Sequence, residues 1–179
     1  MKRNAAEAYF AGGCFWCTQA LFNNLKGVDG VEVGYSGGML SNPSYEAVSS
    51  GSTNHAETIK IIFDPKIISY KDLIYVFLRT HDPTTMNRQG TDVGTQYRSV
   101  IFYANDEQKK TALKEIKKAQ KLYSNPIVTQ VIPSGAFYKA EKYHQDYYVK
   151  NPQKPYCTLV IDPKIQKLKK EFKEYLKSS

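Results

Sequence analysis

The sequence predicts an α+β fold with a ferredoxin-like β-α-β-β-α-β core, a mixed sheet, and an extra strand and helices toward the C-terminus. Three observations lead to this fold class. Strand-like and helix-like segments follow one another in that order through residue 104. The 179-residue chain, 41% hydrophobic, can bury one sizeable core without disulfides or metals. Because no repeat, low-complexity tract or linker divides it, we expect residues 1–179 to form a single domain.

The six core elements are recognised from their apolar patterning and from the residues at their ends. A short strand near 8–11 precedes Gly12 and Gly13, and a helix follows from about Cys14 to Leu25. Ser69 is a suitable N-cap for the second helix. The remaining core elements are a strand at 30–36, a strand at 57–63, a helix at 69–80 and a strand at 96–104.

Beyond the core, the pattern predicts a helix at 106–122, a strand at 126–133 and a helix at 138–149. The segment around Cys157 is predicted to be a strand, and a charged helix follows it at 163–177. Two long polar loops lie within the core, one before the strand at 57–63 and one before the strand at 96–104. Loops on a rigid sheet commonly carry functional residues, so we expect the site there.

The formal net charge of +8 comes mainly from lysines in the segments 107–121 and 163–177. Both segments also carry apolar residues at helical spacing: Leu113, Ile116 and Leu122 in the first, and Ile165, Leu168, Phe172 and Leu176 in the second. The lysines are therefore expected on the solvent faces of amphipathic helices. Arginine is scarce and no nucleic-acid-binding motif accompanies the charge, so we expect no nucleic-acid partner.

No stretch approaches the length of a membrane-spanning helix, and the start MKRNAAEAYFAGGC lacks the apolar run of a signal peptide. We therefore expect a cytoplasmic protein, monomeric and without a membrane partner. Its three cysteines are an odd number and cannot form a closed disulfide framework. Thiol chemistry or metal binding is the expected use of these cysteines.

The stretch AGGCFWCTQA places Cys14 and Cys17 around the only tryptophan, Trp16. Strand, two glycines and helix put Cys14 at a helix N-terminus, where unpaired N–H groups and the helix dipole favour a thiolate, the reactive form of cysteine. Cys17 lies at i+3 on roughly the same face, so the two thiols could form a readily reducible disulfide.

This stretch has three other interpretations. A zinc site needs a second pair of ligands, but only Cys157 and three isolated histidines remain, at 55, 81 and 144. A thioredoxin-like disulfide oxidoreductase normally has its tryptophan before the first cysteine, whereas here Phe15 and Trp16 lie between the two. Purely structural burial stays open, because free cysteine packs as a small hydrophobe.

A carboxylate is predicted on the apolar face of the strand at 57–63. Alternation places Glu57 on the side of Ile59, Ile61 and Phe63, where desolvation would raise its pKa toward that of a general acid at neutral pH. The alternative is a glutamate at a strand end, turned into solvent. Tyr45 and Tyr97 are notable because they adjoin the glycine-rich loops.

Four blocks of the sequence together resemble the A-type peptide methionine sulfoxide reductases. They are GGCFWC, GYSGGMLSNPSYEAVSSGSTNHAE, HDPTTMNRQGTDVGTQYRSVIFY and AEKYHQDYYVKNP, in this order over about residues 8 to 152. The resemblance implies repair of oxidative damage by thiol-dependent reduction of methionine S-sulfoxide, free or in proteins, to methionine. It also implies no metal or organic cofactor, and an external reductant, thioredoxin or dithiothreitol.

The resemblance assigns roles to seven residues by their positions in these blocks. Cys14 matches the nucleophile, and Phe15 and Trp16 match the aromatic pair that receives the methyl group of the substrate. Glu57 matches the acid that protonates the sulfoxide oxygen. The three others are Tyr45 and Tyr97, which match phenols that hydrogen-bond that oxygen, and Asp92, which matches an aspartate that helps to hold the substrate or the site.

The resemblance leaves open which thiol resolves the sulfenic acid that forms on Cys14. Cys17 is a recycling cysteine in some relatives and glycine in many others, whereas Cys157 lies close to the C-terminal recycling cysteine of still others. A packed tail would hold Cys157 in place, so proximity favours Cys17. Gln19 stands where many relatives have glutamate, which puts one local hydrogen bond in doubt.

Two further functions remain as alternatives to a sulfoxide reductase. One is a general thiol–disulfide oxidoreductase that uses Cys14 and Cys17 as its redox pair, and the other is a basic binding module with a structural cysteine cluster.

Overall fold

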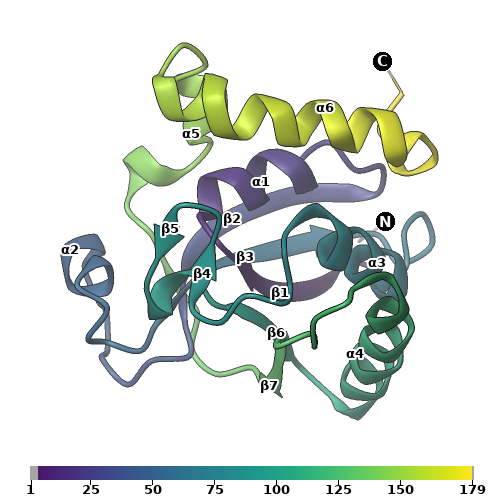
Figure 1. The fold of residues 1–179 in the computed structure, drawn as a ribbon, viewed down its shortest axis with the longest axis horizontal. Helices are drawn as coiled ribbons and strands as arrows, with labels where there is room; N and C mark the ends of the chain where they lie inside the picture. The colour runs from purple at the N-terminus through teal and green to yellow at the C-terminus, as the bar shows by residue number, and fades with distance from the viewer. Residues whose placement is uncertain (1–3, 179) are drawn as a thin grey trace.

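The computed structural model describes residues 4–178, which form one six-stranded sheet, a short two-stranded sheet and surrounding helices (Figure 1). The strand order of the large sheet is β7-β6-β1-β3-β2-β8. The core elements are β1 (Ala6–Gly12), α1 (Phe15–Phe22), β2 (Val28–Ser36), β3 (Ala56–Phe63), α3 (Tyr70–Thr80) and β6 (Ser99–Tyr103). None of the helices in the described residues is long and apolar enough to cross a membrane.

The four central strands have the predicted ferredoxin-like arrangement. Strands β6, β1, β3 and β2 are neighbours in this order and every pair is antiparallel. Helix α1 connects the inner strand β1 to the outer strand β2, and α3 connects β3 to β6. Strand β7 (Gln130–Pro133) follows α4 (Asp106–Ala119) and pairs parallel with β6, so the sheet is mixed, as expected.

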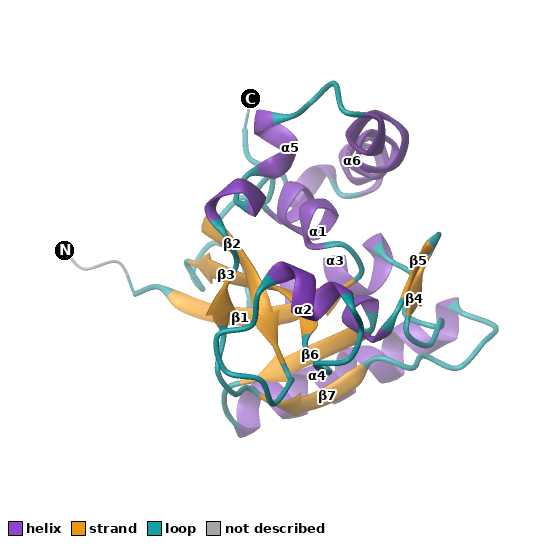
Figure 2. Cartoon of the chain, turned by 90° about the vertical axis from the view of Figure 1, so that its left-hand side faces the viewer, coloured by secondary structure: helices purple, strands orange, loops and turns teal. Residues whose placement is uncertain are grey.

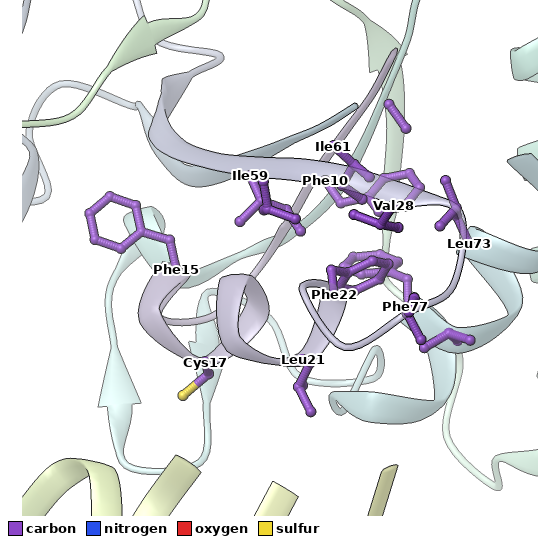
Figure 3. Packing of buried hydrophobic residues seen from close by; sticks show 14 of the residues in the cluster. Phe10, Phe15, Cys17, Leu21, Phe22, Val28, Ile59, Ile61, Leu73 and Phe77 are labelled. Atoms are coloured by element: carbon purple, nitrogen blue, oxygen red, sulfur yellow. The ribbon is translucent and has the colours of Figure 1, made fainter. Parts of the chain in front are cut away.

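Helix α1 lies between the sheet and helix α6 (Asp162–Glu171), as Figure 1 shows. Its side chains are buried almost all round, which is typical of a helix covered on two sides. Phe22 faces Phe10 of β1 at a ring distance of 6.0 Å. Cys17 and Leu21 project from the side of α1 opposite to Ile59 (Figure 3). This double cover makes the surroundings of Cys17 depend on the C-terminal helix.

The helix predicted at 138–149 is wrong. Tyr138–Lys139 form strand β8, which pairs with β2, and only a 3₁₀ turn at Lys142–His144 and the short helix α5 (Tyr147–Lys150) follow. The side-chain amide of Gln145 accepts a hydrogen bond from the N–H of Val33 at 3.0 Å and donates to its carbonyl at 2.8 Å. Pairing with the edge of the sheet therefore overrides the helical periodicity of this segment.

The strand predicted around Cys157 is also wrong. Cys157–Ile161 form a π-helical turn that continues directly into α6. A short apolar run fits a strand and a buried helix equally well, and here contact with α1 decides for the helix. Ile165 and Leu168 of α6 are buried as expected, and so is Phe172 directly after it. The helix predicted to continue to residue 177 ends at Glu171 instead, and a 3₁₀ turn follows at Lys173–Tyr175.

The apolar face predicted for α4 is rotated in the structure. Leu113 and Leu122 are 50% and 61% exposed, whereas Ala112 and Ala119 are buried. Small alanines allow α4 to pack closely against α3, so a face of larger residues is left to the solvent. The predicted helix ends in a 3₁₀ turn at Gln120–Leu122.

The two polar loops contain short elements that the sequence pattern did not predict. Helix α2 (Tyr45–Ser49) lies in the first loop, and the hairpin of β4 (Arg88–Gln89) and β5 (Asp92–Val93) lies in the second. A 3₁₀ turn at Thr95–Tyr97 replaces the first residues of the strand expected at 96–104. Helix α2 and the β4–β5 hairpin lie on the side of the molecule where α1 begins, which faces the viewer in Figure 2.

Candidate active site

Cys14 is placed at the start of α1 by the turn between β1 and that helix. Gly13 has a positive φ of 92°, and a Cβ at this position would come within 2.7 Å of the Gln89 side chain, so glycine is required there. The carbonyl of Cys14 accepts hydrogen bonds from the N–H groups of Cys17 and Thr18 at 3.1 and 3.3 Å. Cys14 is therefore the N-cap residue of α1, as the sequence predicted.

Glu57 lies directly beside this helix start. Its side chain is 3% exposed and shares the inner face of β3 with Ile59, as alternation predicted. The N–H of Phe15, one of the free donors at the helix N-terminus, donates to Glu57 Oε2 at 3.0 Å. Burial raises the pKa of Glu57 to about 8, although the hydrogen bond from Phe15 opposes this shift. Glu57 therefore keeps its proton at neutral pH, on the oxygen that does not accept from Phe15.

A cavity of about 160 Å³ opens above Cys14 and Glu57. A cavity of roughly 150 Å³ in another protein is large enough to hold benzene, so the methylsulfinyl end of a side chain fits here. All seven residues to which the resemblance assigned a role line the cavity. Tyr156, to which it assigned none, lines the cavity as well. The lining residues are Cys14, Phe15, Trp16, Tyr45, Glu57, Asp92, Tyr97 and Tyr156.

The thiols of Cys14 and Cys17 act as a pair. Burial raises the pKa of Cys14, and a hydrogen bond with Cys17 and the charge that Glu57 carries once it is ionised raise it further. The pKa of Cys17 falls to about 7 instead, chiefly because it receives the hydrogen bond from Cys14. The expectation of a stabilised thiolate at Cys14 is therefore wrong, because burial disfavours the charged form of this thiol.

Tyr45 and Tyr97 supply two phenol groups to the same cavity. Burial raises the pKa of both, and the nearby charge of Glu57 raises both further. Each hydroxyl therefore keeps its proton at neutral pH and serves as a hydrogen-bond donor. Tyr45 is the first residue of α2 and Tyr97 is the last of the 3₁₀ turn before β6, so both polar loops contribute to the site.

The wall formed by Trp16 depends on residues of the C-terminal segment to which the sequence analysis gave no role. The indole Nε1 of Trp16 donates to Nδ1 of His144 at 3.0 Å, and Tyr147 stacks on the indole at 3.7 Å and 5°. Tyr156 meets the same ring edge-on at 5.8 Å. His144 and Tyr147 belong to AEKYHQDYYVKNP, one of the blocks that carry the resemblance, which was the available signal.

His144 and Glu141 join this wall to the rest of the site. Burial lowers the pKa of His144, so its ring is neutral. Because Nδ1 accepts from Trp16, the ring proton lies on Nε2, 3.8 Å from a carboxylate oxygen of Glu141. Glu141 also accepts hydrogen bonds from the hydroxyl of Tyr35 at 2.8 Å and the N–H of Tyr45 at 2.9 Å. One carboxylate thus links α2 to β2, while His144 Nε2 beside it has no hydrogen-bond partner among the described residues.

Gln19, where many relatives have glutamate, makes two hydrogen bonds in this chain. Its Nε2 donates to the carbonyl of Val31 at 2.8 Å, and its Oε1 accepts from the N–H of Asp146 at 2.9 Å. Asp146 has a left-handed φ of 56° directly before Tyr147. The buried amide therefore ties α1 to the segment that carries the stacking partner of Trp16.

Cys157 lies outside the cavity lining. It is fully buried against the core, and burial raises its pKa. All three cysteines are free thiols. Within residues 4–178, no group of three or more cysteine, histidine, aspartate or glutamate side chains is arranged to hold a metal ion.

Comparisons with known proteins bear on the use of this site. The family described as peptide methionine sulfoxide reductase matches residues 6–176. The peptide methionine sulfoxide reductase MsrA of Sulfolobus acidocaldarius is 52% identical over 165 residues, 92% of this chain and 94% of that protein. Reduced Mxr1 from Saccharomyces cerevisiae aligns with a TM-score of 0.81 and 36% identity over 88% of this chain and 91% of that chain. Mxr1 in complex with Trx2 aligns with a TM-score of 0.58 and 26% identity over 82% and 87%.

These similarities cover nearly the whole chain, including every residue that lines the cavity. The structural alignment confirms the α+β fold independently of the sequence match. A thiol, a protonated carboxyl and two phenols inside an aromatic wall are the groups that reduction of a sulfoxide by a thiol requires. The chain belongs to the peptide methionine sulfoxide reductases, the enzymes that return oxidised methionine to methionine.

Proposed function

We propose that this enzyme reduces the S epimer of methionine sulfoxide, free or in proteins, with Cys14 as the nucleophile and Glu57 as the general acid. The observation that carries the proposal is the burial of Glu57 beside the start of α1. Its carboxyl group is protonated at neutral pH and lies in the same cavity as the Cys14 thiol. An acid in this state can protonate an oxygen while a thiolate attacks the neighbouring sulfur.

The first half of the reaction balances with these groups. Cys14 loses its thiol proton to solvent and its sulfur attacks the sulfoxide sulfur, while Glu57 gives a proton to the sulfoxide oxygen. The oxygen passes to Cys14 as a sulfenic acid, methionine leaves, and Glu57 takes a proton back from solvent. Tyr45 and Tyr97 donate hydrogen bonds to the oxygen and stabilise the charge that develops on it.

Phe15 and Trp16 receive the methyl group of the substrate, and Asp92 holds the polar end of the substrate at the cavity rim. A flat indole fixed by His144 and Tyr147 offers a rigid apolar surface for a small methyl group. The lining of the cavity is chemically uneven, because it combines apolar aromatic rings with a carboxyl group and phenol hydrogen-bond donors. This asymmetry supports selection of one epimer at sulfur.

Reduction of separated epimers tests the proposed activity. We expect the protein with dithiothreitol to convert a methionine-S-sulfoxide peptide to the methionine peptide and to leave the R epimer unchanged, with products identified by mass spectrometry. Insulin reduction serves as the control, because a general disulfide oxidoreductase would act on it. Equal turnover of both epimers, or of neither, would contradict the proposal.

In the second half of the reaction, the Cys17 thiol attacks the sulfenic acid on Cys14 to form a disulfide and water. Cys17 supports this role because it lies one helical turn after Cys14 on α1 and is hydrogen-bonded to it. A reductant then restores both thiols. The complex of the similar Mxr1 with Trx2 supports thioredoxin as that reductant, and no step of the cycle needs a metal or organic cofactor.

The two candidate resolving cysteines are distinguished by peptide mapping after one turnover. We expect Cys17→Ser to release methionine once and then to hold Cys14 as a sulfenic acid, because its resolving thiol is missing. We expect Cys157→Ala to form the Cys14–Cys17 disulfide as the parent protein does. A Cys14–Cys157 disulfide in the parent protein would assign the role to Cys157 instead.

We further propose that the chain acts as one monomeric, cytoplasmic domain spanning residues 1–179. The cavity is complete within a single chain, and the family match covers residues 6–176. Three free cysteines suit a reducing compartment, where thiol-dependent turnover can be sustained.

A further inference from the structure

The hydroxyl of Tyr156 lies between the Cys17 thiol and the Asp92 carboxylate. Tyr156 Oη is 3.5 Å from Cys17 Sγ, within the range of a sulfur hydrogen bond, and it donates to Asp92 Oδ2 at 2.9 Å. The three side chains come from α1, from the residue before the π-helical turn, and from β5. Contacts between such distant parts of the chain form only in the folded protein.

The three groups differ in their access to solvent. Cys17 is 1% exposed, whereas Asp92 at the rim of the cavity is partly exposed. A buried thiol must lose its proton before its sulfur can act as a nucleophile, because the thiolate is the reactive form. The Tyr156 hydroxyl connects the Cys17 thiol to a carboxylate that is partly exposed to solvent.

We propose that Tyr156 is a catalytic residue in the second half of the reaction. Its hydroxyl carries the proton of the Cys17 thiol to Asp92 while the Cys17 sulfur attacks the oxidised Cys14. This inference rests on the proposed role of Cys17 as the resolving thiol. It gives Asp92 a second function in addition to holding the substrate.

The step balances in atoms and protons. A bond forms between the sulfurs of Cys17 and Cys14, and the S–O bond of the sulfenic acid breaks. The Cys17 proton moves to the Tyr156 oxygen as the Tyr156 proton moves to Asp92, and Glu57 protonates the departing hydroxide to give water. Asp92 then loses a proton to solvent and Glu57 regains one, so thiol and sulfenic acid yield disulfide and water.

The charged and titratable groups around Cys17 show why a relay is needed at this step. In the reduced site the hydrogen bond from the Cys14 thiol is the main cause of the lowered pKa of Cys17, with smaller contributions from Lys164 of α6 and from Tyr156. Asp92 opposes ionisation, and Cys157 is a further neighbour. Oxidation of Cys14 converts its thiol to a sulfenic acid, so the S–H donor that lowers the pKa of Cys17 in the reduced site is absent when Cys17 must react.

Tyr156→Phe tests the relay, because it removes the hydroxyl and keeps the ring that meets Trp16. In single turnovers with a methionine-S-sulfoxide peptide, we expect disulfide formation to slow roughly 100-fold more than methionine release, the scale of general acid–base catalysis. The sulfenic acid on Cys14 should accumulate and be trapped by dimedone. Disulfide formation in the variant should recover as the pH is raised, since hydroxide can then remove the thiol proton.

The chain offers a matched control in Tyr148. Its hydroxyl donates a hydrogen bond to Asp162 at 2.6 Å, and neither residue lines the cavity. Tyr148→Phe also deletes one tyrosine–aspartate hydrogen bond and should leave the ratio of the two rates unchanged. An equal slowing of both steps by Tyr156→Phe, or unchanged disulfide formation, would overturn the relay. Failure of the proposed function gives different results: no methionine from the parent protein, or disulfide formation that persists in Cys17→Ser.

Discussion

Cys14→Ser is expected to lower sulfoxide reduction by roughly 10⁴-fold or more, the scale on which enzymes lose activity with their nucleophile. Within the described residues, Cys14 is the only cysteine that lines the cavity. A serine hydroxyl fits the space but ionises far less readily than a thiol and attacks sulfur poorly. Cys17 cannot replace it, because its side chain is buried beneath the cavity.

The measurement is the steady-state rate of reduction of a methionine-S-sulfoxide peptide with dithiothreitol. Cys157→Ala is the matched control, because it removes a buried thiol outside the cavity and should retain turnover with dithiothreitol. Thermal unfolding of both variants establishes that each is folded. Turnover by folded Cys14→Ser within tenfold of the parent rate would exclude Cys14 as the nucleophile.

Glu57→Gln is expected to lower the rate of the sulfoxide reduction step by roughly 10² to 10⁴-fold, the usual contribution of a general acid. The amide oxygen can still accept the hydrogen bond from Phe15 that now goes to Glu57. The amide has no acidic proton to give to the sulfoxide oxygen. The loss should therefore appear in methionine release in a single turnover. Formation of the Cys14–Cys17 disulfide, in which Glu57 protonates the departing hydroxide, should slow as well.

The stability of Glu57→Gln provides a second readout with a defined sign. The pKa of Glu57 is raised from 4.5 to about 8 in the folded protein, because its charged form is buried. Its contribution to stability is fully present below pH 4.5 and is lost as the pH rises through about 8. Glutamine has no charge to bury. Relative to the parent, the variant should gain a few kcal/mol in the free energy of unfolding between pH 4 and pH 9, at about 1.4 kcal/mol per pKa unit.

Denaturant titrations at the two pH values measure this difference. Asp64→Asn, a change at a carboxylate of the turn after β3, is a control for a general effect of lost negative charge. A variant that reduces the sulfoxide as fast as the parent at neutral pH would remove Glu57 as the general acid. A pH-independent difference in stability would show that Glu57 ionises normally in the folded protein.

Local sequence patterns determined the core of the fold because those segments obey one period along their whole length. In the strand containing Glu57, the face that carries Glu57, Ile59 and Ile61 is buried as alternation requires. Ser69 forms the predicted cap, with Asp72 completing a capping box. The same local reasoning failed for 138–149 and for the segment around Cys157, because their conformation depends on pairing with β2 and packing on α1.

By itself, the sequence determined the fold class, the family resemblance and the identity of the residues proposed for the chemistry. Only the tertiary structure decided which of them touch and in which protonation state they stand. The Phe15–Glu57 bond joins residues 42 apart in the chain, and the Cys17–Tyr156 contact joins residues 139 apart. Periodicity extends over a few turns or strand residues, whereas burial and proton sharing depend on distances that exist only after the chain has folded.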